Sequence, residues 1–143
     1  MNPKSNACLF CKIAKGEIPS EKIYENEHVL AFLDIHPNNP GHTLIIPKEH
    51  YADFLETPDN VLTEIMSAGK KIAPKIMEAV GAHGFNTVFN TRPAAGQVVF
   101  HTHMHIIPRY FNDGHKHWTA GQYKDGEKEE VGKKIRKEIS ANS

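Results

Sequence analysis

Apolar and polar residues alternate along the chain with two different periods, and the shorter period predicts strands. Runs of alternating or continuous apolar residues, bounded by turn-forming residues, are typical of strands. The sequence predicts five of them, at residues 22–25, 29–35, 43–47, 84–90 and 98–108. A tight polar turn at residues 26–27 joins the first two strands into a hairpin, and turn-forming residues precede the third.

The longer period, with apolar residues three and four apart, predicts helices. A short helix is expected at residues 8–16, a long one at 59–80 and a third at 127–139. Pro74 interrupts the long helix, so we expect a kink or break one turn earlier. The third helix has only a narrow apolar stripe, formed by Val131, Ile135 and Ile139, and its other faces carry Lys and Glu.

This order of elements predicts an α+β fold, because short turns link consecutive strands and the long helix has an apolar face to bury. We expect an antiparallel five-stranded sheet packed against the long helix, with the short N-terminal helix beside it. A chain of 143 residues is long enough for one domain with a real core. The prediction is a single domain, 1–143, with a core at about 8–110 and a C-terminal extension at 111–143.

Composition and charge restrict the function classes. Lys+Arg and Asp+Glu both number 17, so the formal charge is zero, and we expect no nucleic acid partner. No segment approaches the ~20 apolar residues of a membrane span, and the N-terminal residues do not resemble a signal peptide. We therefore expect a cytosolic protein with no membrane partner, in which two cysteines are reduced or metal-bound.

Three histidines occupy every second position of an apolar run, Phe100 to Arg109. If this run is a strand, His101, His103 and His105 share one face at intervals of about 6.6–6.8 Å. The residues between them would then face the long helix, and the histidines would line the open face of the sheet.

Three interpretations of this row compete. It can be the water-facing side of a sheet, a set of ligands for a catalytic metal, or a site of covalent catalysis by one imidazole. The preceding loop favours anion chemistry. Gly96 lets backbone N–H groups approach an anion, and the side chains of Asn90 and Gln97 add donors.

Cys8 and Cys11 form a C-x-x-C motif near the N-terminus. A redox role would place this pair after a strand, and no strand is predicted before it. A structural metal would need two further ligands, for which His50 and His101 are candidates. The remaining alternative is two buried thiols.

The chain resembles the histidine triad (HIT) superfamily, whose signature alternates three histidines with apolar residues. The signature here is "HTHMHII", with Thr102 as a departure, and "GEIP", "HVLAFLDI", "PGHTLIIPKEH" and "AGQVVFHTHMHIIPR" extend the resemblance over about residues 8–109. The match is closest to the bacterial, Hint-like branch. It implies an enzyme acting on the α-phosphate of a purine nucleotide, with no organic cofactor.

The resemblance also implies residue roles. His103 matches the nucleophile that forms a nucleotidyl-imidazole intermediate, and His105 matches a phosphate-binding histidine. His101 matches the residue whose main chain orients the nucleophile, and His42 matches a fourth histidine behind the triad. Asp34 matches the carboxylate that binds the ribose. The purine pocket corresponds to Leu9, Phe10, Ile13, Phe32, Leu33 and Ile35, and the phosphate loop to Asn90, Gly96, Gln97 and Val98.

Members of this branch are homodimers whose two sheets join across the interface, and the resemblance extends that expectation to this chain. In members with C-x-x-C, a structural zinc is held by those cysteines, the His of "PKEH" and the first triad histidine. The matching residues are Cys8, Cys11, His50 and His101.

One departure bears on activity. Many members have Ser or Thr where this chain has Val98, and that hydroxyl contacts the phosphate or the leaving group. The leading hypothesis is a hydrolase or transferase that cleaves nucleoside 5′-phosphoramidates or dinucleoside polyphosphates and releases AMP or GMP. The alternatives are a metal-dependent hydrolase and a nucleotide-binding module with little catalysis.

Overall fold

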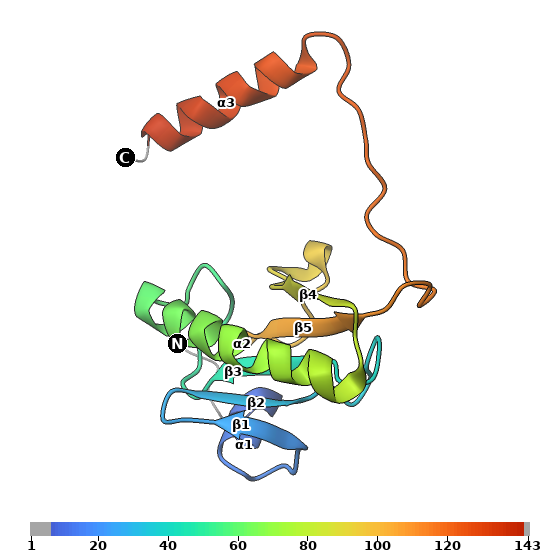
Figure 1. The fold of residues 1–143 in the computed structure, drawn as a ribbon. Helices are drawn as coiled ribbons and strands as arrows, with labels where there is room; N and C mark the ends of the chain where they lie inside the picture. Colours follow the sequence, from blue (N-terminus) through green and yellow to red (C-terminus); the bar gives the residue numbers. More distant parts are fainter. Residues whose placement is uncertain (1–6, 142–143) are drawn as a thin grey trace. The chain divides into compact units, whose positions relative to one another are not determined.

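The computed structural model describes residues 7–141, and its first unit, which ends at Asp113, contains a five-stranded antiparallel sheet (Figure 1). The strands lie in the order β1-β2-β3-β5-β4. The elements are α1 (Leu9–Ala14), β1 (Lys22–Glu25), β2 (Val29–Leu33), β3 (Thr43–Pro47), α2 (Asp59–Val80), β4 (Gly84–Val88), the 3₁₀ turn η1 (Pro93–Ala95) and β5 (Met104–Arg109). The predicted α+β fold is confirmed.

The two helices of this unit cover opposite faces of the sheet. Side chains alternate along each strand, so the strands present apolar residues to both faces. On one face, Val29, Ala31 and Ile45 pack with Ile65 and Ile72 of α2. On the other face, a second apolar cluster brings α1 against β2 and β3; its buried members are Cys8, Phe10, Cys11, Leu30, Phe32, Leu44 and Ile46. The prediction that the histidines line an open face is therefore wrong, since α1 covers part of it.

The fifth strand is shorter than predicted, and this changes where the histidines lie. It begins at Met104, which pairs with Ile45 of β3, so only His105 of the three is in the strand. Upstream of it, the main-chain N–H of Thr102 donates to the oxygen of Tyr51 at 2.7 Å, in the segment that follows β3. That bond takes the chain out of the sheet ladder.

Two other expectations about element boundaries are also corrected. The second and fourth strands end at Leu33 and Val88, two residues before the predicted ends. The long helix is unbroken through Pro74. Pro74 faces solvent, whereas Ile72, Ala73 and Ile76 on either side of it are buried against the sheet, and that burial holds the helix together.

Beyond Asp113 the chain forms a second unit, which contains α3 (Glu127–Ala141). The third helix occurs where the sequence predicts it. The division of a single domain into a core at about 8–110 and an extension stays a prediction. In α3 the side chains of Ile135 and Ile139 are 54% and 65% exposed. Within residues 7–141, no helix combines the length and apolar character needed to cross a bilayer.

Candidate active site

His103 is held in one tautomer by a main-chain carbonyl. Its Nδ1 lies 2.7 Å from the oxygen of His101. Because a carbonyl only accepts, Nδ1 carries the proton and donates it, which leaves a lone pair on Nε2. The side chain is 8% exposed and lines a cavity, so this Nε2 belongs to an imidazole that a small ligand can reach.

Phe10 of α1 fixes the plane of the His103 ring. The two rings meet edge to face, with centroids 5.0 Å apart and planes at 89°. Phe10 is itself packed edge to face on Phe32 of β2, at 5.6 Å. The short helix that carries Phe10 is capped at its N-terminus by Cys8, whose Sγ accepts a hydrogen bond from the N–H of Cys11. The N-terminal helix therefore orients the central histidine.

A second chain of hydrogen bonds sets the proton on His105. The N–H of Asn38 donates to His42 Nδ1 at 3.0 Å, so the proton of neutral His42 is on Nε2. That Nε2–H donates to His105 Nδ1 at 2.9 Å. The proton of neutral His105 is consequently on its own Nε2, which is buried and has no hydrogen-bond partner among the described residues. Adjacent imidazoles thus present a lone pair, on His103, and an N–H donor, on His105.

Burial keeps these imidazoles neutral at pH 7. Desolvation is the largest of the effects that lower the pKa of His105 to about 4, and the neighbouring His103 and His42 act in the same direction. Desolvation also lowers the pKa of His103 and of His42. Asp34, whose Oδ2 lies 3.6 Å from His42 Nε2, raises the pKa values of these three histidines, but burial is the larger effect.

The cavity in front of these histidines has a volume of about 500 Å³ and is lined mainly by apolar side chains. Every residue predicted for nucleotide binding lines it, apart from Gln97: Leu9, Phe10, Ile13, Phe32, Leu33, Asp34, Ile35, Asn90, Gly96, Val98, His103 and His105. The sequence reasoning missed six further lining residues, namely Ile18, Pro19, Ser20, His36, Leu44 and Val99. The sequence held a signal for Leu44, because it follows His42 by two positions at the start of a predicted strand and so shares its face. In the structure Leu44 pairs with His105.

The loop before the histidines offers fewer donors than expected. The Gln97 side chain is buried, and its Nε2 donates to the oxygens of Ala52 and Val99, so it orders the loop and has no hydrogen left for an anion. The N–H of Gly96 donates to Pro93. What Gly96 provides is a φ of 94°, which side-chain-bearing residues rarely adopt. The remaining donors on this side of the cavity are the N–H of Val98 and the Asn90 amide.

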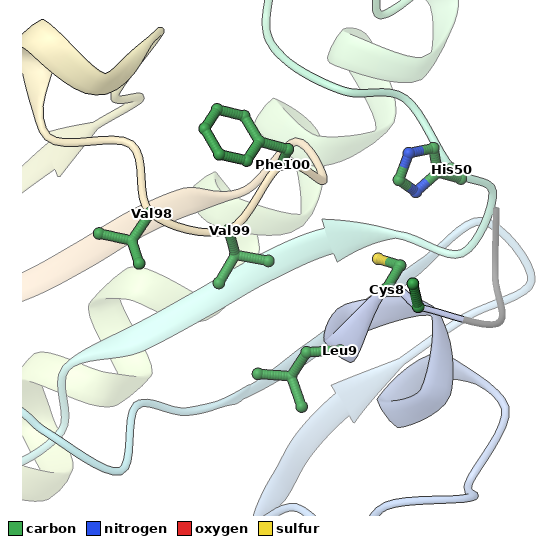
Figure 2. A pocket seen from close by; sticks show the side chains of 7 residues that line it. Cys8, Leu9, His50, Val98, Val99 and Phe100 are labelled. Carbon is green, nitrogen blue, oxygen red and sulfur yellow. The ribbon is translucent and has the colours of Figure 1, made fainter. Parts of the chain in front are cut away.

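Val98 lies where two cavities meet. A smaller cavity of about 290 Å³ opens beside the main one, between the start of α1 and the loop, and Leu9, Val98 and Val99 line both (Figure 2). Val98 is 82% exposed. Its side chain is apolar and offers no hydroxyl donor at this position.

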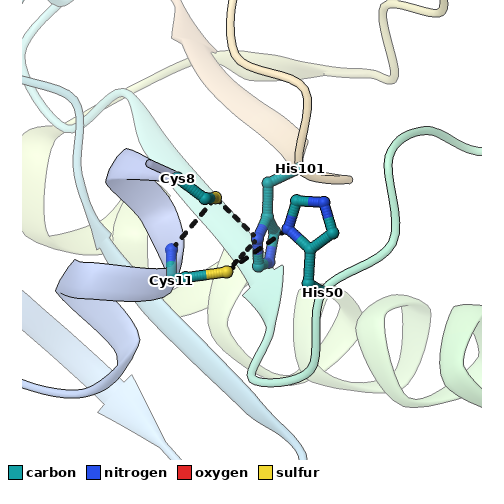
Figure 3. A group of neighbouring side chains, drawn as sticks. All are labelled: Cys8, Cys11, His50 and His101. Atoms are coloured by element: carbon teal, nitrogen blue, oxygen red, sulfur yellow. Dashed lines mark hydrogen bonds between the residues drawn. The ribbon is translucent and has the colours of Figure 1, made fainter. Parts of the chain in front are cut away.

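The four residues proposed as zinc ligands lie together (Figure 3). The Sγ atoms of Cys8 and Cys11 each lie 3.4 Å from His101 Nδ1, and Cys11 Sγ lies 3.3 Å from His50 Nδ1. His101 Nε2 donates to the oxygen of Pro47 at 2.9 Å, so its Nδ1 lone pair faces the sulfurs. Two sulfurs and two imidazole nitrogens within 4.8 Å of one another could hold a metal ion, and the set matches a tetrahedral Cys₂His₂ site.

A second group, formed by Asp34, His42 and His105, also lies within 4.8 Å. Its hydrogen bonds argue against a metal there. A neutral imidazole binds a metal through an unprotonated nitrogen. The bond from Asn38 places the His42 proton on Nε2, and His42 in turn occupies Nδ1 of His105, whose remaining nitrogen carries its proton.

Comparison with known proteins shows which family this chain belongs to. The sequence model of the HIT domain matches residues 15–112, and the chain belongs to the HIT family. Within that family it resembles the Hint-like proteins with an N-terminal C-x-x-C. A HIT-like protein of Methanocaldococcus jannaschii is 48% identical over 129 residues, which are 90% of this chain and 98% of that protein.

Two relatives carry names that state an activity. An adenylylsulfatase of Arabidopsis thaliana is 48% identical over 108 residues, 76% of this chain and 55% of that protein. An adenosine 5′-monophosphoramidase of Schizosaccharomyces pombe is 44% identical over 103 residues, 72% of this chain and 74% of that protein.

Solved structures share the fold. A Streptococcus mutans protein superposes with a TM-score of 0.88 at 41% identity, over 97% of this chain and 89% of that one. A zinc-bound histidine triad protein of Mycobacterium smegmatis superposes with a TM-score of 0.74 at 38% identity, over 81% of this chain and 84% of that one.

Proposed function

We propose that this protein hydrolyses nucleoside 5′-phosphoramidates, and related nucleotides with a leaving group on the α-phosphorus, through a covalent intermediate on His103. The observation that carries the proposal is the pairing of an imidazole lone pair, on His103 Nε2, with an imidazole donor, on His105 Nε2. A phosphoryl group needs both, since its phosphorus accepts the attack and its anionic oxygens need donors.

The reaction follows from these protonation states. His103 Nε2 attacks the α-phosphorus and the bond from phosphorus to the leaving amine breaks. The amine departs with a proton from water. The proton stays on Nδ1, hydrogen-bonded to the His101 carbonyl, which stabilises the positive charge of the phosphorylated ring. Water then attacks phosphorus and gives its proton to the hydroxide left by the first step. The P–N bond to His103 breaks with its electron pair returning to Nε2, and the nucleoside monophosphate is released. His105 Nε2–H, Val98 N–H and the Asn90 amide donate to the phosphoryl oxygens throughout.

The rest of the cavity fits a purine nucleoside. Phe10, Phe32 and Ile13 provide apolar walls for a planar base, and the Asp34 carboxylate at the cavity wall accepts hydrogen bonds from ribose hydroxyls. The named relatives act, by their names, on adenosine phosphates whose leaving groups are an amine or sulfate. That common feature supports a purine nucleotide as the substrate and leaves AMP and GMP as the expected products.

The cysteine–histidine cluster is proposed to bind a structural zinc ion, and the existence of a zinc-bound histidine triad relative supports this proposal. Cys8, Cys11, His50 and His101 would hold the ion, which supplies rigidity and no chemistry at phosphorus. Because His101 would be a ligand while its carbonyl holds His103, the metal would fix the nucleophile's backbone. Homodimerisation with joined sheets and a cytosolic location stay predictions.

The test replaces His103 with Ala and measures release of the amine from adenosine 5′-phosphoramidate. We expect kcat/KM to fall by at least about 10³-fold, because the variant lacks the imidazole that makes the proposed attack. His28→Ala, at an exposed histidine outside the cavity, is the matched control and should keep wild-type turnover. Undiminished turnover in folded His103→Ala protein would contradict the mechanism.

Val98 supports a second candidate, a nucleotide-binding module with little catalysis, because the leaving group lacks a hydroxyl donor there. Tight AMP binding without turnover of phosphoramidates or dinucleoside polyphosphates by the wild-type protein would favour this alternative.

A further inference from the structure

A buried carboxylate outside the cavity ties together two segments that lead to the catalytic histidines. The Asp113 side chain is 6% exposed, and it accepts from Arg109 Nε at 2.8 Å, Arg109 Nη2 at 3.1 Å, Asn39 Nδ2 at 3.0 Å and the Tyr110 N–H at 3.1 Å. We call Asp113, Arg109 and Asn39 the Asp113 clamp.

The clamp joins the end of β5 to the loop between β2 and β3. Arg109 is the last residue of β5, four positions after His105, and its Nη1 also donates to Asn86 Oδ1 of β4 at 2.8 Å. Asn39 lies in the loop, and its Nδ2 also donates to the oxygen of Pro108 at 2.8 Å. Each of the three guanidinium nitrogens of Arg109 therefore makes a hydrogen bond within the fold.

Close packing holds the same loop against its neighbours. A Cβ added at Gly41 would lie 3.1 Å from Val80 Cγ1 and 3.2 Å from Pro108 Cγ. The Tyr110 hydroxyl donates to the oxygen of Val80 at 2.9 Å, which ties the segment after β5 to the end of α2. The loop is therefore fixed both by the clamp and by contact with Pro108 and α2.

This loop decides where the proton of His42 lies. Asn38, next to Asn39, donates its N–H to His42 Nδ1 at 3.0 Å. The N–H of His42 donates in return to the oxygen of Asn39, also at 3.0 Å. A shift of Asn39 would move both bonds. If His42 Nδ1 lost its donor, the imidazole could carry its proton there and would no longer donate to His105.

We infer that Asp113 is a positioning residue, which holds the β2–β3 loop so that the protons of His42 and His105 stay on Nε2. The effect passes from Asp113 to Asn39, to the N–H of Asn38, to His42 and then to His105. The role of the His105 Nε2 proton as a donor to phosphoryl oxygens rests on the proposed function. The inference about where that proton lies does not.

The direct readout is the tautomer of each histidine, from two-bond ¹⁵N–¹H correlations of the imidazoles at pH 7.5. In the wild-type protein we expect His42 and His105 as the Nε2–H tautomers. Asp113→Asn keeps the shape but replaces an acceptor oxygen by an amide that faces the donors of Arg109 and Asn39. We expect a mixture of tautomers at His42, and kcat reduced between about 10- and 100-fold with little change in KM.

A second variant and a matched control separate this effect from general damage. Asn39→Ala removes the link to the loop while the Arg109–Asp113 pair remains, so it should reproduce the tautomer change even if Asp113→Asn folds poorly. Glu25→Gln removes an exposed carboxylate that pairs with Lys22 and Lys48 on the far edge of the sheet, and it should leave both tautomers unchanged. In a His42→Ala background, Asp113→Asn should cause no further loss of kcat.

The outcomes are distinct from those of the function test. If folded Asp113→Asn and Asn39→Ala proteins keep the wild-type tautomers, the inference is wrong whatever their activity. If the tautomers change while turnover does not, the clamp acts as inferred and the role proposed for the His105 proton is wrong.

Discussion

The imidazole of His101 faces two sulfur atoms while its main-chain oxygen, 2.7 Å from His103 Nδ1, holds the central histidine. One residue therefore belongs both to the cluster proposed to bind zinc and to the support of the proposed nucleophile. This arrangement couples the structural site to the chemical one.

The first prediction follows from that coupling. Cys11→Ser should lower the bound zinc, measured by elemental analysis against wild-type protein, and should lower both the melting temperature and kcat, because His101 loses a fixed partner. Circular dichroism at the assay temperature distinguishes a folded protein with an impaired site from an unfolded one. Full zinc content and wild-type kcat in Cys11→Ser would contradict the coupling.

The second prediction concerns pH and stability. Burial lowers the pKa of His105 to about 4, against an ordinary value of 6.5, so the unfolded chain binds more protons than the native one between these pH values. The stability that the native protein has with a neutral His105 is fully present above pH 6.5 and is lost as the pH falls towards 4. Urea unfolding at several pH values should show a free energy of unfolding that decreases on acidification over this window.

The matched variant for this measurement is His105→Asn, which lacks the titrating group. Its free energy of unfolding should fall less steeply between pH 6.5 and 4 than that of the wild type. Parallel pH dependences for the two proteins would show that His105 is not held neutral by burial.

The third prediction concerns Val98. Because its side chain is 82% exposed, Val98→Ser should change stability by less than about 0.5 kcal/mol. The new hydroxyl stands at the mouth of the cavity and can donate to the leaving nitrogen, so we expect a several-fold increase in kcat for phosphoramidates of basic amines. Val98→Ala is the control, since it shortens the side chain without adding a donor, and an equal increase there would discount the hydroxyl.

The fourth prediction concerns Asp34. If this carboxylate binds the ribose hydroxyls, Asp34→Asn should raise KM for the adenosine substrate by about tenfold, the effect of losing a hydrogen bond to a charged group. The KM of a 2′,3′-dideoxy substrate should respond much less, because it lacks those hydroxyls. Equal effects on both substrates would contradict ribose binding and would indicate that Asp34 acts through His42, whose Nε2 lies 3.6 Å from Asp34 Oδ2.

The sheet and helices could be predicted from sequence because their patterns are local. The alternation in β3 and the helical spacing of α2 gave their bounds correctly. The run from Phe100 to Arg109 also alternates, but its first half leaves the sheet. The cause is a bond between Thr102 and Tyr51, which are far apart in sequence, and no local pattern reveals it.

The site divides in a similar way. The row of histidines together with the preceding loop indicated anion chemistry, whereas the roles of Asp34 and His42 came only from the family resemblance. The inward turn of Gln97 could not be foreseen, because it depends on the oxygen of Ala52, 45 residues earlier. The Asp113 clamp was missed for the same reason, since Asn39 reaches Asp113, 74 residues later, only in the folded chain.

The most direct test of the central claim is intact-mass analysis of the protein after rapid acid-free quenching of its reaction with adenosine 5′-phosphoramidate. The covalent mechanism predicts a transient protein species heavier by one adenylyl group, mapped by peptide fragmentation to His103 and missing from His103→Ala. Turnover at the wild-type rate with no adduct at any quench time, or with the adduct on another residue, would contradict it.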